Sequence, residues 1–358
     1  DKTTEPMGEL AERLKAIAPV PMSKVFFANS GSEANDTAVK MIYYYNNALG
    51  RPEKKKIIAR QFGFHGVTMA AASITGIPAM HAGFDLPLPN FKHTEFPHYY
   101  RFGKDGESEE DFATRMAESL EAMILEEGPE TVAAFVAEPV MGGGGCVVPP
   151  KTYFEKKQAV LNKYDVLMVA DEVITGFGRT GNMFGSETFN IKPDIMTLAK
   201  GLTNAAVPMG AVLVSGEIFD TFMDGPDNII ELFHGYTYSS HPLACAAGLA
   251  TLALYEKENL FERAASLESY WQSAVHGLQG LENVIDIRDI GLTAGIEMAP
   301  RDGAPGMRGY EALVACFEAG ALVRVTGDTI ALSPPLIIAE TQIDELLTIV
   351  ASAIENIS

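Results

Sequence analysis

Short apolar runs alternate with longer amphipathic stretches along most of the chain, and this order constrains the fold more than any other feature of the sequence. The apolar runs are typical of buried strands, and the stretches between them have helical periodicity. Strands that alternate with helices indicate an α/β fold with a mainly parallel sheet between helices. The expected strands are Lys24–Ala28, Lys56–Ala59, Val132–Val136, Val166–Ala170, Ile195–Leu198 and Gly210–Val214, and the expected helices include Glu33–Asn47, Glu109–Glu126 and Thr152–Tyr164.

The pattern changes after a helix rich in small residues that runs from His241 to about Glu256. Beyond it, the expected strands lie near Val284–Ile287, Leu292–Met298 and Ile330–Leu332. The sequence therefore predicts two domains: a large domain over residues 1–256 and a smaller α+β domain over residues 257–358.

Polar residues follow several of the expected strands, and two of them point to a cofactor. Asp171 ends the apolar run Val166–Ala170, and Lys200 follows Ile195–Leu198 between a small residue and a glycine. A buried carboxylate stays ionised when it faces a cationic ring nitrogen, and a lysine at a neighbouring strand end can form a Schiff base with an aldehyde. Taken alone, each residue is more commonly a helix cap or a surface lysine. The pair in this setting indicates a pyridoxal phosphate site.

The segment Asn29–Ser32 has features of an anion site. It follows a strand and precedes a helix, so backbone N–H groups and the helix dipole converge on one point. Gly31 permits close approach of a ligand. A serine N-cap with glycine in the turn is the commoner explanation of such a segment taken alone.

Charge and cysteine usage exclude several classes of partner. The chain carries 27 Lys and Arg against 47 Asp and Glu, a net charge of −20. Nucleic acid and anionic membranes require basic surface, so we expect neither as a partner. Cys146, Cys245 and Cys316 share no metal-ligand spacing and are too few for a disulfide framework, and no run reaches the roughly 18 apolar residues of a membrane span. We expect a cytoplasmic protein without a metal ion.

Seven sequence blocks, in order, resemble the class III or omega aminotransferases, which are pyridoxal phosphate enzymes of the aspartate aminotransferase superfamily. The blocks are Asn29–Ala34, Phe64–Gly66, Glu138–Pro139, Asp171–Val173, Lys200–Leu202, Gly235–Pro242 and Ser333–Leu336. The resemblance implies fold type I, with a seven-stranded sheet and a small C-terminal domain. It also implies a homodimer with shared active sites, and possible assembly into a tetramer. Family members carry a further N-terminal segment, whereas this chain begins at Asp1, where the first large-domain helix is expected.

The resemblance also assigns roles to individual residues. Lys200 and Asp171 are the expected catalytic residues, with Lys200 as the base and Asp171 as the partner of the ring nitrogen. Phe64 stacks on one face of the ring, and Val173, two residues beyond Asp171 and on the same side of an extended strand, covers the other. The other expected cofactor-binding residues are Gly31 and Ser32 at the phosphate, Thr237 at the phosphate of the neighbouring subunit, His65 packed beside the ring, and Glu138 in support of this network.

Two missing residues indicate the subgroup. Members that use 2-oxoglutarate have a glutamate where this chain has Gly143 and an arginine where it has Ala331. Pyruvate-dependent members instead carry an arginine in a Val-Arg-x-x-Gly-Asp segment, which Arg324 matches. An arginine there clamps a carboxylate bidentately and swings aside for apolar groups. A surface ion pair is the alternative role for Arg324.

We therefore expect a transaminase of the β-alanine–pyruvate type, which moves the amino group of an omega-amino acid or primary amine to pyruvate by a ping-pong mechanism. One alternative is a related class III enzyme: a 2-oxoglutarate-dependent aminotransferase, an aminomutase or a dialkylglycine decarboxylase. The other is a nucleotide-binding or non-enzymatic α/β protein, which is disfavoured because no Gly-x-Gly-x-x-Gly turn follows the first strand.

Overall fold

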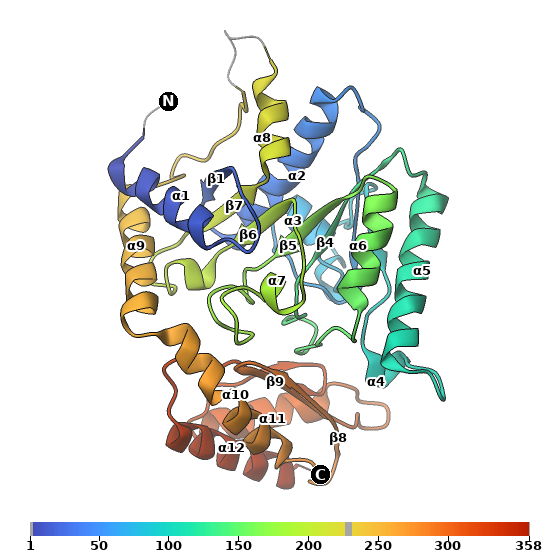
Figure 1. Cartoon of the computed structure of the whole chain (residues 1–358). Helices are drawn as coiled ribbons and strands as arrows, with labels where there is room; N and C mark the ends of the chain where they lie inside the picture. Colours follow the sequence, from blue (N-terminus) through green and yellow to red (C-terminus); the bar gives the residue numbers. More distant parts are fainter. Residues whose placement is uncertain (1–2, 226–230, 358) are drawn as a thin grey trace.

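The computed structural model describes residues 3–225 and 231–357, so Asp1 lies outside the described part. Within these residues the larger sheet has seven strands in the order β1-β7-β6-β5-β4-β2-β3 (Figure 1). Strand β7 runs antiparallel to β1 and β6, and the other pairs are parallel. The predicted α/β fold is therefore confirmed. The strands are β1 (Lys24–Ala28), β2 (Lys56–Arg60), β3 (Phe91–Thr94), β4 (Val132–Ala137), β5 (Leu167–Asp171), β6 (Ile195–Leu198) and β7 (Gly210–Val214).

Helices cover both faces of this sheet. Every residue of β4 is buried, as expected for an apolar strand enclosed on both sides. One hydrophobic cluster contains Ile58 of β2 and side chains of α1 (Glu5–Ile17), α5 (Glu109–Glu127), α6 (Tyr153–Lys163) and α9 (Pro242–Lys257). The cluster on the opposite face contains Ile57 and side chains of α2 (Gly31–Ala48), α3 (Met69–Ile74) and α8 (Gly216–Met223).

The C-terminal part forms a smaller unit with its own hydrophobic cluster. Its antiparallel sheet has the order β10-β11-β9-β8. The elements are α10 (Leu260–His276), β8 (Val284–Ile290), β9 (Thr293–Met298), α11 (Met307–Glu318), β10 (Arg324–Thr326), β11 (Thr329–Leu332) and α12 (Glu340–Glu355). The domain boundary predicted between residues 256 and 257 falls in the last turn of α9 and stays a prediction.

Two strands escaped the sequence prediction. β3 is an edge strand of the large sheet with the polar sequence Phe-Lys-His-Thr, and β10 has only three residues. Both are fixed by pairing with neighbouring strands and not by an apolar pattern of their own. The short elements α4 (Tyr99–Phe102), α7 (Gly185–Thr188), η1 (Pro78–Met80) and η2 (Lys200–Leu202) complete the described structure.

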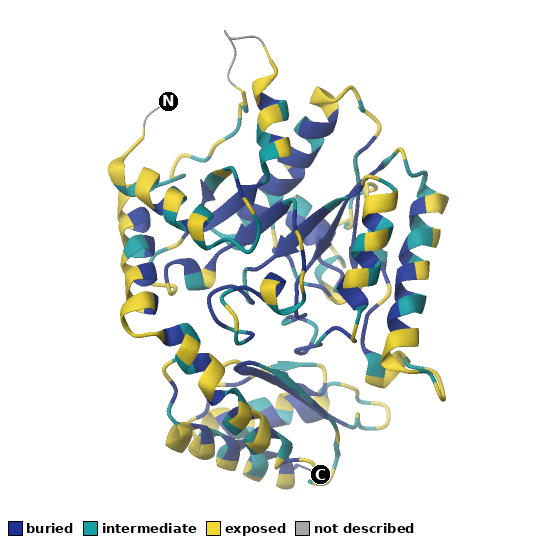
Figure 2. Cartoon of the chain, in the orientation of Figure 1, coloured by how far each residue is buried: buried dark blue, intermediate teal, exposed yellow. Residues whose placement is uncertain are grey.

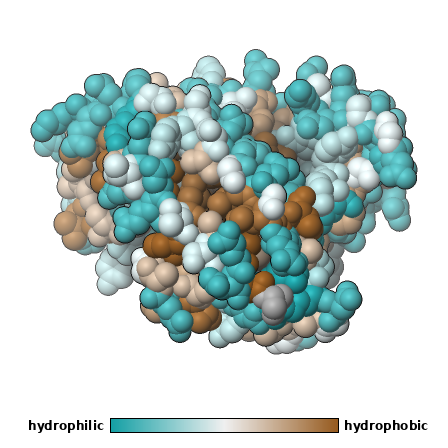
Figure 3. Space-filling view, turned by 90° about the horizontal axis from the view of Figure 1, so that it is seen from below, coloured by the Kyte–Doolittle hydropathy of each residue, from teal (hydrophilic) through white to brown (hydrophobic). Residues whose placement is uncertain are grey.

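The surface is that of a globular chain. Figure 2 shows the sheet strands buried and the outer faces of the helices exposed. Seen from below, the molecule is hydrophilic around most of its outline, with hydrophobic residues gathered near the middle (Figure 3). Among the described residues, no helix has the length and apolar character that crossing a membrane requires.

Candidate active site

A cavity of about 330 Å³ lies at the carboxyl edge of the large sheet, where segments that follow β1, β2, β4, β5 and β6 meet. All the residues predicted to bind the cofactor line this cavity except Thr237. They are Gly31, Ser32, Phe64, His65, Glu138, Asp171, Val173 and Lys200. The parallel strands thus bring together side chains that are far apart in the sequence.

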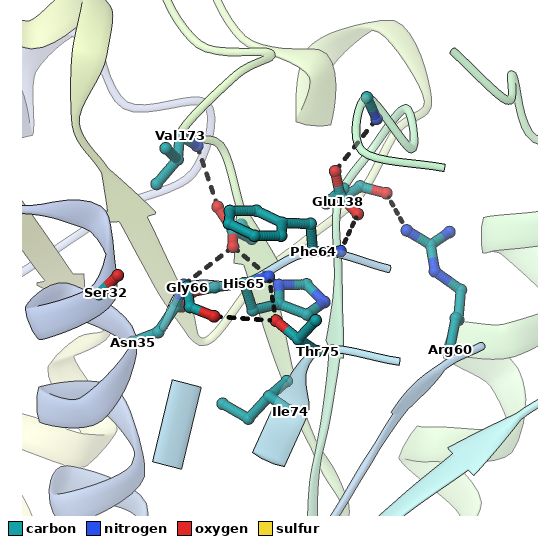
Figure 4. Close-up of polar contacts among 12 residues, drawn as sticks. Ser32, Asn35, Arg60, Phe64, His65, Gly66, Ile74, Thr75, Glu138 and Val173 are labelled. Carbon is teal, nitrogen blue, oxygen red and sulfur yellow. Dashed lines mark hydrogen bonds and ion pairs between the residues drawn. The ribbon is translucent and has the colours of Figure 1, made fainter. Parts of the chain in front are cut away.

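Asp171, the last residue of β5, is held by three hydrogen bonds from Asn35, His65 and Val173, which are labelled in Figure 4. Its Oδ2 atom lies 2.9 Å from Asn35 Nδ2 and 2.8 Å from His65 Nδ1, and its Oδ1 atom accepts from the Val173 backbone N–H at 3.1 Å. Burial alone raises the pKa of this carboxyl, but the bonds from His65 and Asn35 outweigh burial and the net pKa is lowered. Asp171 is therefore ionised at neutral pH although it is only 3% exposed.

Hydrogen bonds with neighbouring residues hold His65 in place, rather than leaving it free to act as a base. Its backbone N–H donates to Thr75 Oγ1 at 2.8 Å, and its carbonyl accepts from Asn35 Nδ2 at 2.7 Å. Since Nδ1 donates to Asp171, His65 supports the carboxylate. The Nε2 atom has no hydrogen-bond partner among the described residues. This geometry agrees with the packing and hydrogen-bonding role predicted for His65, which stays a prediction.

Lys200 follows β6 directly, in the turn η2, with a φ of 40°. Left-handed backbone at a residue other than glycine costs about 1–3 kcal/mol and clusters at functional sites. Its side chain is accessible because it borders the cavity. The surrounding protein still lowers the pKa of the amine by desolvation, while Asp171 and Glu138 act in the opposite direction. A lowered pKa favours the neutral amine, the form that acts as nucleophile and base.

Glu138 connects two loops beside the cavity. Its Oε1 atom accepts from the Phe64 backbone N–H at 3.0 Å, and Oε2 accepts from the Gly142 N–H at 3.1 Å. The carbonyl of Glu138 accepts from Arg60 Nη2 at 2.5 Å. Desolvation raises the pKa of this carboxyl, which is 2% exposed. Glu138 thus positions the backbone of Phe64, whose ring borders the cavity.

The start of α2 has the serine cap and glycine turn on which the predicted anion site rests, and the binding of an anion there stays a prediction. Ser30 is the N-cap, and its Oγ accepts from the Glu33 N–H at 3.2 Å. The first N–H groups of a helix have no partner within the helix and attract an anion. A Cβ added to Gly31 would lie 3.1 Å from Val173 Cγ2, so glycine keeps this wall of the cavity open.

The predicted geometry of Val173 is wrong, although the residue does line the cavity. Strand β5 ends at Asp171, and Val173 lies in the turn that follows. The Asp171 carboxylate accepts the Val173 N–H, which folds the chain back locally instead of extending the strand. Val173 therefore packs against Gly31 from a loop and not from a strand.

Thr237 and Arg324 lie outside the main cavity. Thr237 is exposed in a surface turn and lines none of the cavities found among the described residues. Arg324 is also exposed, but it lines a neighbouring cavity of about 540 Å³ that shares Ile174, Lys200 and Ala205 with the first. We call this neighbouring cavity the entrance. Arg324 in its wall is close enough for its charge to contribute to the lowered pKa of Lys200.

One of the two positions predicted to indicate the subgroup is paired with Arg324. Ala331 of β11 is the direct partner of Arg324 across the β10–β11 ladder. Directly opposed residues share a face of the sheet, with Cβ atoms roughly 5 Å apart. The side chain of an arginine at position 324 or at position 331 therefore leaves the sheet from nearly the same point. A Cβ added to Gly143 would lie 2.6 Å from Phe64 Cβ, so a larger residue there requires Phe64 to move.

Sequence reasoning missed Asn35 and Thr75. Asn35 lies one helical turn after Gly31, so its side chain points to the same side as the cradle, and this spacing was a usable signal. Thr75 follows α3, and nothing in its local sequence places it beside His65.

Comparisons with known proteins agree with this geometry. A model of the family described as aminotransferase class-III matches residues 2–354. Gamma-aminobutyrate transaminase 1, mitochondrial, of Oryza sativa subsp. indica is 49% identical over 362 residues, which cover 99% of this chain and 70% of that protein. The probable gamma-aminobutyrate transaminase 2, mitochondrial, of the same organism is 51% identical, with 99% and 73% covered. The solved omega transaminase from Pseudomonas jessenii in complex with PMP is 49% identical with a TM-score of 0.97, and the match covers 99% of this chain and 80% of that one.

Proposed function

We propose a specific reaction on the premise that this chain belongs to the class III aminotransferases, pyridoxal phosphate-dependent enzymes that transfer amino groups. The proposed reaction moves the amino group of an omega-amino acid or primary amine, such as β-alanine, to pyruvate. When bound, pyridoxal phosphate supplies an aldehyde and an electron-withdrawing ring. The proposal rests most directly on Arg324 at the cavity entrance, opposite Ala331.

The cavity fits the cofactor. Its volume of about 330 Å³ lies within the range of small-molecule sites. The N-terminus of α2 suits a phosphate, and the ionised Asp171 suits a protonated ring nitrogen. Phe64 and Val173 offer the two apolar walls that a flat ring requires.

Each residue at the base of the cavity has a defined task. Asp171, held by His65 and Asn35, would hold a proton on the ring nitrogen of bound cofactor. Lys200 would hold the cofactor aldehyde, and its Nζ atom would accept and return a proton as the base. Glu138 fixes the backbone of Phe64, so the stacking ring keeps its place while substrates exchange.

The acceptor is assigned from the residues at the entrance. Arg324 binds the carboxylate of pyruvate with two parallel hydrogen bonds. Position 143 is a glycine and offers no carboxylate to neutralise that arginine between substrates, and the space at this position is already bounded by Phe64. A short keto acid such as pyruvate suits this arrangement.

The donor is assigned more broadly. The curated relatives are gamma-aminobutyrate transaminases and the solved neighbours include omega transaminases, according to their names. An omega-amino acid carries its amine far from its carboxylate, so the amine reaches Lys200 while the carboxylate stays near Arg324. An uncharged amine uses the same path when Arg324 swings outward.

A matrix of donors and acceptors tests the proposal. β-Alanine, 4-aminobutyrate and an aryl-alkyl amine are each paired with pyruvate and with 2-oxoglutarate, and initial rates are measured. We expect pyruvate to be the better acceptor for every donor. Equal or faster rates with 2-oxoglutarate place the chain among the 2-oxoglutarate-dependent members, and carbon dioxide release or turnover without a keto acid indicates a different class III reaction.

We further propose a homodimer in the cytoplasm, in which Thr237 contacts the cofactor phosphate of the neighbouring subunit. The exposed turn that carries Thr237 supports the shared site. The three free, buried cysteines support the cytoplasmic location. The experiment is to dissociate the dimer by dilution and measure bound pyridoxal phosphate. Release of cofactor together with dissociation is expected, whereas a monomer that binds it as tightly contradicts the shared site.

A further inference from the structure

A cluster of buried hydrogen-bond donors lies behind the active site, on the side of the large sheet covered by α5 and α6. It consists of Arg60 on β2, Thr94 on β3, and Tyr153 and Lys157 on α6, all at most 1% exposed. We call these four residues the donor cluster. None of them has a part in the proposed reaction.

Most of the polar atoms of the donor cluster lack a partner. Arg60 Nε, Arg60 Nη1, Thr94 Oγ1 and Tyr153 OH have no hydrogen-bond partner of good geometry among the described residues, although Arg60 lies close enough to the Tyr153 hydroxyl to oppose the rise that burial causes in its pKa. Lys157 Nζ donates once, to the Met116 carbonyl at 2.7 Å, and has two further N–H groups. Buried donors without partners are rare, and each requires an explanation such as a water or an ion.

These side chains lie close to one another. Arg60 and Thr94 are direct partners across the β2–β3 ladder, so their side chains leave the sheet on the same face. The Arg60 guanidinium carbon lies 6.0 Å from the centroid of the Tyr153 ring, and Lys157 Nζ lies 5.3 Å from it. The donor cluster therefore occupies one region between the sheet and α6.

No described carboxylate bonds to the side chains of the donor cluster. Arg60 and Lys157 are both basic, and they donate to the backbone carbonyls of Glu138 and Met116. Desolvation and the charge of Arg60 together lower the pKa of Lys157 to about 7, while the exposed Glu95 acts in the opposite direction. The Glu138 carboxyl acts on Arg60 through space and without a hydrogen bond. A buried basic group without a bonded counter-charge is costly.

Water satisfies this cluster poorly. A water molecule there can donate only to the Thr94 and Tyr153 hydroxyls, since Arg60 and protonated Lys157 offer donors alone. An anion accepts from every member and also balances charge. A second cavity, of about 680 Å³, has Tyr153 of the donor cluster and its neighbour Phe154 in its wall.

We propose that Arg60, Thr94, Tyr153 and Lys157 form a buried binding site for a small monovalent inorganic anion of the size of chloride. The anion accepts from Arg60 Nε and Nη1, Tyr153 OH, Thr94 Oγ1 and Lys157 Nζ. Arg60 Nη2 donates to the Glu138 carbonyl, so the anion also fixes the group that supports the active-site loop (Figure 4).

Bromide diffraction locates the anion directly. Crystals of the holoenzyme are soaked in bromide, and the anomalous signal is measured at the bromine edge. The site predicts a peak within hydrogen-bond reach of the Arg60 guanidinium and the Tyr153 hydroxyl. An ordered water at that point, or no peak there while bromide occupies other places, overturns the proposal.

Thermal unfolding of the holoenzyme tests binding in solution, with chloride replacing gluconate at constant ionic strength. A ligand that binds only the folded state raises Tm, by about 3–6 °C at a hundredfold excess over its dissociation constant. Lys157→Met and the milder Tyr153→Phe should each lose most of this rise. Lys156→Met is the matched control, since Lys156 is the partly exposed neighbour on α6 that bonds to Thr114 Oγ1.

The outcomes separate clearly. A chloride effect that persists in the control and is lost in both cluster variants supports the site. The same rise in Tyr153→Phe and Lys157→Met as in the native protein contradicts it. If Lys157→Met does not fold, Tyr153→Phe decides alone, because it removes one donor and leaves the ring packing unchanged.

Discussion

The floor and the entrance of the active site are built in different ways. On the floor, Asn35 and His65 both bond to Asp171, and all three residues are at most 3% exposed. At the entrance, Arg324 is exposed on a strand of three residues. A buried, bonded network holds one geometry, whereas a long exposed side chain samples many. This contrast implies that the floor determines the reaction and the entrance determines the substrate.

One glycine-rich loop connects the two regions. Gly142 N–H donates to Glu138 Oε2 on the floor side, and the Gly143 carbonyl accepts from Thr326 Oγ1 of β10 at 3.1 Å. The Gly145 carbonyl accepts from Arg288 Nη2 of β8 at 2.7 Å. Any shift of the C-terminal sheet is therefore transmitted to the loop beside Phe64.

Loss of Lys200 should have the largest effect on the floor. Lys200→Ala removes both the attachment point of the cofactor and the base, so turnover should fall by at least about 10³-fold. Borohydride reduction of the native enzyme followed by mass spectrometry should find the reduced cofactor on Lys200. An adduct on any other lysine refutes this assignment.

Neutralising the floor carboxylate should have a somewhat smaller effect. Asp171→Asn keeps the size of the side chain and its bond to Asn35 but removes the charge opposite the ring nitrogen. We expect bound cofactor with turnover reduced by about 10²–10³-fold. The control is Asp289→Asn. It alters a carboxylate of β8 that is paired with His276 of α10, and the variant should remain active. Near-normal turnover of Asp171→Asn means that the carboxylate has another role.

The contacts between the C-terminal sheet and the large domain should depend on pH. Glu297 of β9 is desolvated, which raises its pKa, but bonds to His98, Arg288 and Arg101 outweigh this and lower the pKa to about 2 from 4.5. Because the folded-state pKa is depressed, the stabilisation is fully present above pH 4.5 and is lost as pH falls towards 2. Urea unfolding should therefore show Glu297→Gln less stable than the native protein at pH 6, with the difference shrinking as the pH is lowered.

The control for this experiment is Glu318→Gln, at an exposed position of α11. That variant should follow the native protein at every pH. A difference between native protein and Glu297→Gln that stays constant from pH 6 to pH 3 argues against the pairing of Glu297.

The sequence predicted the floor better than the entrance or the donor cluster. Asp171 and Lys200 follow apolar runs, and a run that ends in a polar residue indicates the edge of a parallel sheet. The bonds that fix Asp171 were less visible, because His65 and Asn35 reach it from other segments. The turn at Val173 was missed because an apolar residue after a strand reads as its continuation.

The remaining features depend on tertiary structure. Lys157 occurs in an amphipathic stretch, where a lysine is normally at the surface, and only the packing of α6 on α5 buries it. The pairing of Arg324 with Ala331 requires the β10–β11 register, and β10 is too short to be recognised from its composition.

The most direct test of the proposed function compares half-reactions of Arg324→Ala by single-turnover absorbance of the cofactor. Pyruvate and β-alanine each lose a charge-assisted pair of about 1.5–3 kcal/mol, so their half-reactions should slow about 10–100-fold, while an uncharged aryl-alkyl amine changes little. Arg324→Lys, which keeps the charge without the bidentate geometry, should fall between. An equal loss for charged and uncharged substrates, or no loss for either, contradicts the assignment of Arg324 as the carboxylate clamp.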